Sequence, residues 1–279
     1  MSKELLLSDI PEEKIFEACQ VTWHYTIGFV RLGIVNNQET ADLLGSGVLV
    51  TANKQYAILT AHHVLEILPK TGRLGLVLLD KEEKTTIDID GIDYVKIDRG
   101  NTDKDGPDIG FVKLSTNIAS VIGAKKSFYN LDKRQELFIN NPPNDRDGIW
   151  DAQGFIEQLT KVEMDNNRKK MVKAFCQYGA FGGIEGYEIR GKYDYYDFPI
   201  NDLRRDIDPD NFGGISGGGL WQLILGMNNE GELNVKELLL RGIVYFQDPF
   251  DVHQKSKLRC HAYKSIYEQA YRVISNNTP

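Results

Sequence analysis

Apolar and polar residues alternate over short distances along most of the chain. Ile, Val, Leu, Thr and Tyr are concentrated in short segments separated by clusters of Gly, Asn and Asp: 27–34, 47–50, 56–60, 75–79, 85–90, 92–97 and 109–114. Short strands broken at this spacing are typical of an antiparallel sandwich or barrel. Strands do not alternate with helices of ten or more residues, which disfavours a doubly wound α/β fold.

A second set of apolar segments follows residues 115–135, where the apolar density drops: 136–140, 154–160, 171–178, 186–190, 219–224 and 238–246. Both ends of the chain change period. Residues 11–20 predict a short helix, and between His261 and Ile274 one helical face collects Tyr263, Ile266, Tyr267, Ala270 and Ile274. We therefore expect an all-β protein with a helical extension at 1–24, a β unit at 25–120 and a β unit at 121–279 that ends in a helix.

Composition adds limits on the class of protein. The 279 residues carry 33 Lys and Arg against 40 Asp and Glu, a net charge of −7, with 41% apolar and 26% charged residues. These values are ordinary for a globular chain and exclude a disordered chain, a coiled coil or a fibre. The acidic balance argues against nucleic acid as a partner, because such binding depends on neutralising phosphates.

The cysteines and the N-terminus indicate a compartment. Cys19, Cys176 and Cys260 are far apart and include no CxxC pair, so they predict neither a disulfide framework nor a zinc site. The N-terminal apolar stretch is too short for a secretory signal, and no stretch is long enough to span a membrane. We expect a cytoplasmic protein without a membrane partner.

Three segments carry residue types that suit nucleophilic catalysis. His63 stands where the predicted strand 56–60 has just ended, and Asp108 stands at the start of the strand 109–114. Ser216 lies in the glycine-rich stretch Phe212-Gly-Gly-Ile-Ser-Gly-Gly-Gly-Leu-Trp221. Each alone also fits a structural role, since an Asp before a strand commonly caps a turn.

Together the three residue types meet the needs of acyl transfer. A serine hydroxyl becomes a good nucleophile when an imidazole takes its proton, and a carboxylate fixes the tautomer of that imidazole. Glycines beside the serine let backbone N–H groups point at a developing oxyanion. The combination indicates a nucleophilic acyl-transfer site.

In this order the segments resemble the trypsin/chymotrypsin-like serine peptidases, and the bacterial high-temperature-requirement branch more than the secreted digestive enzymes. The resemblance lies in Thr60-Ala-His-His-Val64 (a Thr-x-x-His-Val box), Asp108-Ile-Gly-Phe-Val-Lys-Leu114 (an Asp-Ile-Ala-Leu box) and Gly214-Ile-Ser-Gly-Gly218 (a Gly-x-Ser-Gly-Gly loop). The separations, 108 − 63 = 45 and 216 − 108 = 108 residues, suit His and Asp from one barrel and Ser from the other. Arg241-Gly-Ile-Val-Tyr-Phe-Gln247 resembles the strand that lines the substrate cleft.

The resemblance implies a chymotrypsin-like fold of two six-stranded antiparallel β-barrels with the site between them. It implies that Ser216 attacks the scissile carbonyl, that His63 and not His62 carries the proton, and that Asp108 holds the imidazole. The backbone N–H groups of Gly214 and Ser216 would form the oxyanion hole. The expected partner is a protein or peptide substrate, with no metal and no organic cofactor.

Some features depart from the family. Ile215 stands where secreted trypsins carry an Asp that pairs with a newly cleaved amino terminus, and there is no Ile-Val-Gly-Gly sequence, so activation by that ion pair is not expected. Glycines at 213–214 and 217–219 make the loop supple. This motivates the hypothesis that a substrate or a regulatory protein partner orders it. We also expect no peptide-binding domain after the peptidase unit.

The residues that set specificity are less clear. Asp210 lies six residues before Ser216, the position of the pocket-base Asp in trypsin, but the stretch 206–211 equally fits a solvated acidic loop. Tyr245, Phe246 and Gln247 are further substrate-binding candidates, and Gln247 replaces a pocket-lining glycine. The sequence leaves the cleavage-site preference open.

Two other interpretations fit parts of the sequence. Gly214-Ile-Ser-Gly-Gly218 also satisfies the G-x-S-x-G pattern of α/β-hydrolases, but the polar stretch 201–211 before it is no strand and only 63 residues follow Ser216. A catalytically silent peptidase fold kept for binding is the alternative function. His62, His24, His253 and His261 are interpreted as structural or surface residues.

Overall fold

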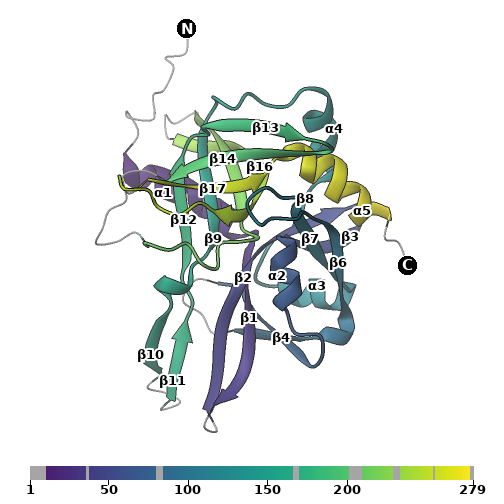
Figure 1. Cartoon of the computed structure of the whole chain (residues 1–279), viewed down its shortest axis with the longest axis vertical. Helices are drawn as coiled ribbons and strands as arrows, with labels where there is room; N and C mark the ends of the chain where they lie inside the picture. Colours follow the sequence, from purple (N-terminus) through teal and green to yellow (C-terminus); the bar gives the residue numbers. More distant parts are fainter. Residues whose placement is uncertain are drawn as a thin grey trace.

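The computed structural model describes residues 11–35, 38–79, 84–165, 170–200, 209–228, 233–253 and 255–276. Two antiparallel sheets make up most of it (Figure 1). The first sheet pairs in the order β5-β4-β1-β2-β3-β7-β6, with a two-residue strand, β8, parallel to β2. Its strands are β1 (Thr26–Val35), β2 (Gln38–Ala52), β3 (Gln55–Thr60), β4 (Arg73–Val77), β5 (Thr85–Asp88), β6 (Ile92–Arg99), β7 (Asp108–Leu114) and β8 (Tyr129–Asn130).

The second sheet comes from the C-terminal half and pairs in the order β12-β9-β15-β16-β17-β14-β13. Its strands are β9 (Ile149–Phe155), β12 (Gln177–Gly182), β13 (Gly186–Arg190), β14 (Tyr193–Ile200), β15 (Gly219–Met227), β16 (Leu233–Gln247) and β17 (Ser256–His261). A separate hairpin consists of β10 (Lys161–Asp165) and β11 (Lys170–Ala174). One apolar core cluster includes side chains from both sheets.

The two sheets share one connectivity. If the six main strands of each are numbered in chain order, both follow the ring 1-2-3-6-5-4. In the first sheet β4, β6 and β7 are strands four to six, and the ring is open between four and five. In the second sheet the strands are β9, β12, β14, β15, β16 and β17, and the ring is open between β12 and β14, which still approach each other. This is the connectivity of a double chymotrypsin-like β-barrel, and it confirms the predicted all-β fold class.

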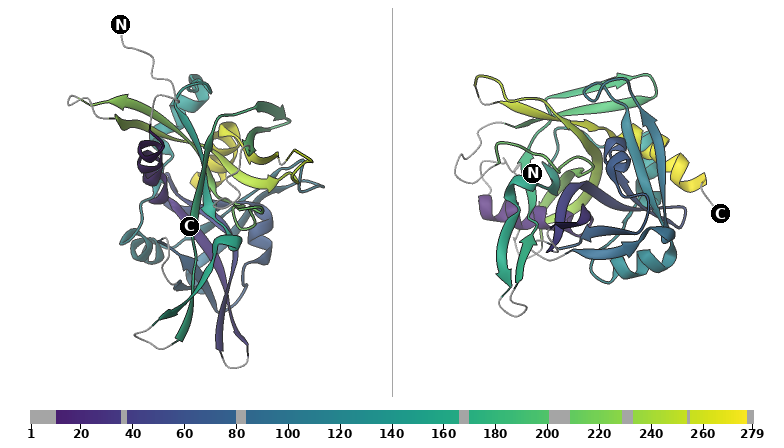
Figure 2. Two further views of the ribbon diagram at one scale, coloured as in Figure 1. Left: turned by 90° about the vertical axis from the view of Figure 1, so that its left-hand side faces the viewer. Right: turned by 60° about the horizontal axis from the view of Figure 1, so that its bottom comes forward.

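Two hairpins extend beyond the barrels in the same direction (Figures 1 and 2). One is β1–β2 of the first sheet and the other is β10–β11. Lys173 Nζ on β11 lies 2.9 Å from Asp42 Oδ1 on β2. The exposed ion pair joins the two hairpins, although such pairs contribute little stability.

Helices lie around the sheets: α1 (Glu12–Trp23), α2 (His62–Ile67), α3 (Thr116–Gly123), α4 (Asp132–Asn140) and α5 (Tyr271–Asn276), which continues a π-helical segment, Ser265–Ala270. The apolar face predicted for the C-terminal helix is confirmed, because all five of its residues are buried. No helix in the described ranges has the length and apolar character needed to cross a membrane.

Two predicted strands are wrong. Of residues 154–160, only Gly154 and Phe155 lie in a strand, at the end of β9, and Glu157–Leu159 form a 3-10 helix. Residues 136–140 belong to helix α4, which begins at Asp132, an acidic residue favoured in a first helical turn. Phe138 is buried and stacks on Tyr267 with ring centroids 4.2 Å apart, whereas Ile139 is 49% exposed. The apolar run therefore reflects one anchoring ring rather than a buried strand.

The N-terminal helix is attached to the second barrel through a buried carboxyl group. Asp151 on β9 is fully buried and accepts hydrogen bonds from Gln153 Nε2 and from the thiol of Cys19. Thr22 Oγ1 lies 2.6 Å from the Cys19 carbonyl oxygen and 3.1 Å from Asp151 Oδ2. Burial raises the pKa of Asp151 to about 7. A hydroxyl has one proton, so Thr22 Oγ1 donates either to the Cys19 carbonyl oxygen or to Asp151 Oδ2.

Asp151→Asn should reduce the pH dependence of the unfolding free energy. Because the folded-state pKa of about 7 lies above the ordinary 3.8, this group's stabilisation is fully present below pH 3.8 and is lost as the pH rises through about 7. From pH 5 to about 7 that window spans about 2 pH units, or about 3 kcal/mol at most. Urea unfolding at pH 5 and pH 8 should show a smaller loss in the variant. Equal losses in both proteins would contradict a buried neutral Asp151.

Candidate functional site

His63 stands beside Asp108 at the ends of two paired strands. β3 ends at Thr60, and α2 carries His63 in its first turn, while β7, which pairs with β3, begins at Asp108. His63 Nδ1 lies 2.7 Å from Asp108 Oδ2, and the His63 backbone N–H donates to Asp108 Oδ1 at 2.9 Å. A carboxylate only accepts, so Nδ1 carries the proton and Nε2 of the neutral ring is free of one. The His63 side chain is 32% exposed and that of Asp108 1%.

The carboxylate of Asp108 has a second cationic neighbour. Arg99, the last residue of β6, is the register partner of Asp108, and its Nη1 donates to Asp108 Oδ2 at 2.5 Å. Its Nη2 donates to Asp103 Oδ1 at 2.6 Å. Burial by itself raises the pKa of Asp108, but the hydrogen bonds from His63 and the Arg99 charge outweigh it and hold the pKa below its ordinary value. Asp108 is therefore ionised at neutral pH.

A buried histidine ties the second barrel to Asp108. The backbone N–H of Asp108 donates to His261 Nε2 at 2.9 Å, and His261 is the last residue of β17. Rings of Tyr193, Tyr195 and Tyr245 surround it, with centroids 5.8, 5.2 and 4.9 Å from the imidazole. Burial lowers the pKa of His261 to about 4, so it is neutral near pH 7 and can accept this bond.

The loop that carries Ser216 is bound to the strands that lead to His63. Ser46 on β2 donates from its backbone N–H to Ser216 O at 2.8 Å and from its Oγ to Gly214 O at 2.7 Å. Thr60, three residues before His63, donates from Oγ1 to Ser46 O at 2.7 Å. Ser216, which is half-buried, is thus held against β2, the strand that pairs with β3.

The backbone amides around Ser216 fall into two groups. Those of Ile215, Gly217 and Gly218 donate to the carbonyl oxygens of Phe212, Val244 and Ile215 at 3.0, 2.7 and 2.8 Å. Those of Gly214 and Ser216 donate to no other described residue. Gly214 has φ +97°, which turns the chain between these two N–H groups. The backbone N–H groups of Gly214 and Ser216, which were predicted to bind the oxyanion, therefore have no acceptor within the described part of the chain.

The predicted substrate-binding residues are spread over different surroundings. Asp210 is exposed, and residues 206–208 of the same acidic stretch lie outside the described residues. Tyr245 is buried, packs on His261 and donates from Oη to Lys104 O at 3.1 Å. Phe246 and Gln247 are half-buried, and Gln247 Oε1 accepts from the Phe212 backbone N–H at 3.1 Å. Gln247 is therefore the one of these four that is bonded to the loop leading to Ser216.

Sequence reasoning missed Arg99 and assigned His261 only a structural or surface role. The predicted strands 92–97 and 109–114 stopped one or two residues short of β6 and β7. Extending them would have placed Arg99 opposite Asp108, where opposite charges stabilise an antiparallel pair. His261 had no sequence signal, since its contact to Asp108 spans 153 residues.

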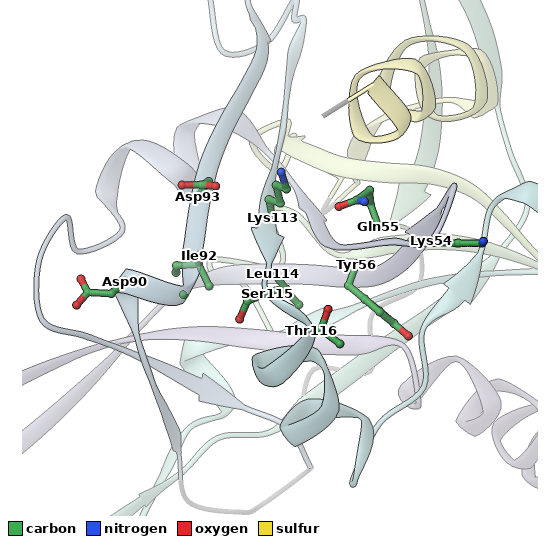
Figure 3. A pocket seen from close by; sticks show the side chains of 11 residues that line it. Lys54, Gln55, Tyr56, Asp90, Ile92, Asp93, Lys113, Leu114, Ser115 and Thr116 are labelled. Carbon is green, nitrogen blue, oxygen red and sulfur yellow. The ribbon is translucent and has the colours of Figure 1, made fainter. Parts of the chain in front are cut away.

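A pocket of about 430 Å³ lies elsewhere on the first barrel (Figure 3). Tyr56, Lys113 and Thr116 are among its lining residues. Tyr56 pairs with Leu114 at one end of β3 and β7, whereas Thr60 pairs with Gly110 at the end next to His63 and Asp108. The pocket is therefore separate from the candidate site. Within the described ranges, no three His, Cys, Asp or Glu side chains gather in a way that could hold a metal ion.

Comparisons with known proteins give likenesses of fold only. No protein-family model and no curated protein matches the chain. A solved structure of the Rv3671c protease from M. tuberculosis, in its active form, is similar at a TM-score of 0.48 and 10% identity, over 97% of this chain and 88% of that one. A structure described for the coupled folding and binding of the Sesbania mosaic virus VPg protein is similar at a TM-score of 0.46 and 13% identity, over 91% of this chain and 92% of that one.

Proposed function

We propose that this chain is a serine endopeptidase that cleaves protein or peptide substrates through an acyl-enzyme. The observation that carries the proposal is the pair of hydrogen bonds from His63 to a buried, ionised Asp108. It fixes the imidazole with Nε2 unprotonated, which is the state a general base needs. The anchoring of the Ser216 loop to Ser46 supports Ser216 as the nucleophile, because it seats that loop against β2, the strand that pairs with β3.

In the proposed reaction Ser216 Oγ attacks the scissile carbonyl carbon while His63 Nε2 takes its proton. Asp108 stabilises the imidazolium that forms, and the N–H groups of Gly214 and Ser216 stabilise the oxyanion. The imidazolium then protonates the leaving amine, and the C–N bond breaks to give the Ser216 ester. Water then attacks the ester carbonyl as His63 takes its proton, the bond from Ser216 Oγ to the acyl carbon breaks, and the imidazolium returns the proton to Ser216 Oγ. Every step uses side chains and backbone amides of the described residues.

Three finer points belong to the same proposal. The motif boxes support a place near the bacterial high-temperature-requirement branch. Cys19 and Cys260 are buried and form no disulfide in the described part of the chain, which suits the expected cytoplasmic location. The glycines around Ser216 suit regulation by a protein partner that acts on the loop.

A fluorophosphonate probe tests the proposal, since it phosphonylates a serine that a base has activated, with loss of fluoride. The native chain should be labelled at Ser216, and Ser216→Ala and His63→Ala should lose the label. Ser120→Ala, which changes an exposed serine in helix α3, is the matched control and should keep it. A native chain that takes no label and does not hydrolyse casein would instead support the silent binding module.

A further inference from the structure

Arg99 contacts the same oxygen of Asp108 that His63 uses. Asp108 Oδ2 accepts from His63 Nδ1 at 2.7 Å and from Arg99 Nη1 at 2.5 Å, while Oδ1 accepts the His63 backbone N–H. We propose that Arg99 is a positioning residue of the candidate site: it orients the Asp108 carboxylate and extends the activity of His63 to lower pH. The inference rests on the proposed function, and it concerns a residue that sequence reasoning did not select.

The orienting effect follows from the hydrogen-bond directions. One carboxylate can rotate about its Cβ–Cγ bond, and a single imidazole contact leaves that rotation soft. Here Oδ1 is held by a backbone N–H and Oδ2 by a charged guanidinium, so both oxygens are fixed independently of the His63 ring. Charge-assisted bonds of this kind are shorter and stronger than neutral ones. The carboxylate therefore presents one oxygen to Nδ1 in a set direction.

The electrostatic effect follows from the charges around the pair. Arg99 is positively charged at every working pH, and it donates to Asp108 Oδ2, the oxygen that also accepts from His63. Its charge therefore disfavours the protonated, positive form of the imidazole. The other described groups facing the pair are His261, neutral near pH 7, and Asp103, an exposed partner of Arg99. Other charged groups around the site are paired: His62 with Glu66, Asp98 with Lys192, Lys104 with Asp248, and Arg190 with Glu188. Arg99 is thus a fixed cation that shares the acceptor of His63, Asp108 Oδ2.

Removing this cation should move the pH range of the reaction. In Arg99→Gln the imidazolium is opposed by one positive charge fewer, so His63 remains protonated to higher pH. The acid limb of the pH profile of kcat/KM should move up by about one pH unit, the low end for a neighbouring charge because Arg99 is 26% exposed and screened. At a pH on that limb kcat/KM falls about tenfold, while the plateau changes by only a few fold.

Two further variants make the test specific. Arg99→Lys keeps the positive charge, so the acid limb of its kcat/KM profile should lie close to the native pH. Arg134→Gln removes an arginine that is 31% exposed and paired with Glu237, and should leave the limb unchanged. A purely structural role for Arg99 would lower the plateau and leave the limb in place, and that result would overturn the proposal. So would a limb that moves equally in Arg134→Gln.

A second measurement separates this inference from the proposed function. In the Ser216→Ala chain, the pH midpoint of His63 ring protonation is followed by ¹H–¹⁵N correlation, with His63→Gln to assign the signal. Adding Arg99→Gln should raise that midpoint by about one pH unit even though the chain is inactive. If the midpoint does not move while the native chain takes the fluorophosphonate label, the role of Arg99 is defeated and the peptidase stays intact. If the midpoint moves while the native chain takes no label, the peptidase is defeated and the coupling stays intact.

Discussion

Asp108→Asn should lower kcat for peptide hydrolysis by about 10²–10⁴-fold, the range that general acid–base catalysis contributes. The amide carries no charge to stabilise the imidazolium that forms when His63 takes the Ser216 proton. The fold should survive, because asparagine has the same shape and Asp108 lies at the start of a strand paired on both sides. Steady-state kinetics on a casein-derived peptide measures the loss, and an unfolding curve like that of the native chain shows that it is chemical.

Arg99 decides how the new amide group is oriented, and so which interaction of His63 is lost. If the new amide placed its NH₂ at the Oδ2 position, that donor would face two other donors, Arg99 Nη1–H and His63 Nδ1–H, so the amide oxygen should take that place. His63 Nδ1–H then keeps an acceptor and the tautomer stays correct, while the NH₂ group faces the His63 backbone N–H and one hydrogen bond is lost. What remains is an uncompensated Arg99 cation beside the imidazole.

The double variant tests this account. In the Asp108→Asn background, Arg99→Gln removes the uncompensated cation and should raise kcat by about tenfold, the value of about one pH unit of interaction. In the native background the same change should lower the rate on the acid limb. The two changes are therefore strongly non-additive, as expected for groups in direct contact. Simple additivity would mean that Arg99 does not act through Asp108.

The positions of His63 and Asp108 were predictable because both depend on local features. Each stands beside a strand that is almost wholly buried, and the burial of β3 and β7 can be seen in their runs of apolar residues. Strands that pair side by side bring their ends together, so the polar residues at those ends meet. The strands and the residue types at their ends placed the candidates, and the resemblance to the peptidase family selected His63 over the neighbouring His62.

The support of the site was not predictable in the same way. His261 reaches Asp108 across 153 residues, and the Ser46 hydroxyl reaches Gly214 O across 168. Neither contact leaves a periodicity or a motif in the chain, because it depends on how the two barrels meet. The wrong prediction of a strand at 136–140 has a related cause. Phe138 is apolar because it stacks on Tyr267, a residue far away in the sequence.

Gly217→Ala should destabilise the chain and remove fluorophosphonate labelling of Ser216. Gly217 has φ +88°, a backbone conformation that disfavours any Cβ, and its N–H donates to Val244 O on β16. A Cβ there would overlap Ser46 O and Thr60 Oγ1, the two atoms that form the hydrogen bond beneath the loop. Ser46 O is a backbone atom in a paired strand and cannot move aside without breaking that pairing.

Backbone strain and overpacking together should lower the free energy of unfolding by about 2–4 kcal/mol, which urea denaturation measures. Gly123→Ala is the matched control, because a Cβ at this exposed end of α3 meets nothing within 4 Å and its φ is not positive. That change should be neutral or stabilising by about 0.5–1 kcal/mol. If Gly217→Ala unfolds like the native chain and still takes the label, the loop can leave its seat on Ser46 without loss. The anchoring of Ser216 through β2 would then not be what prepares the nucleophile.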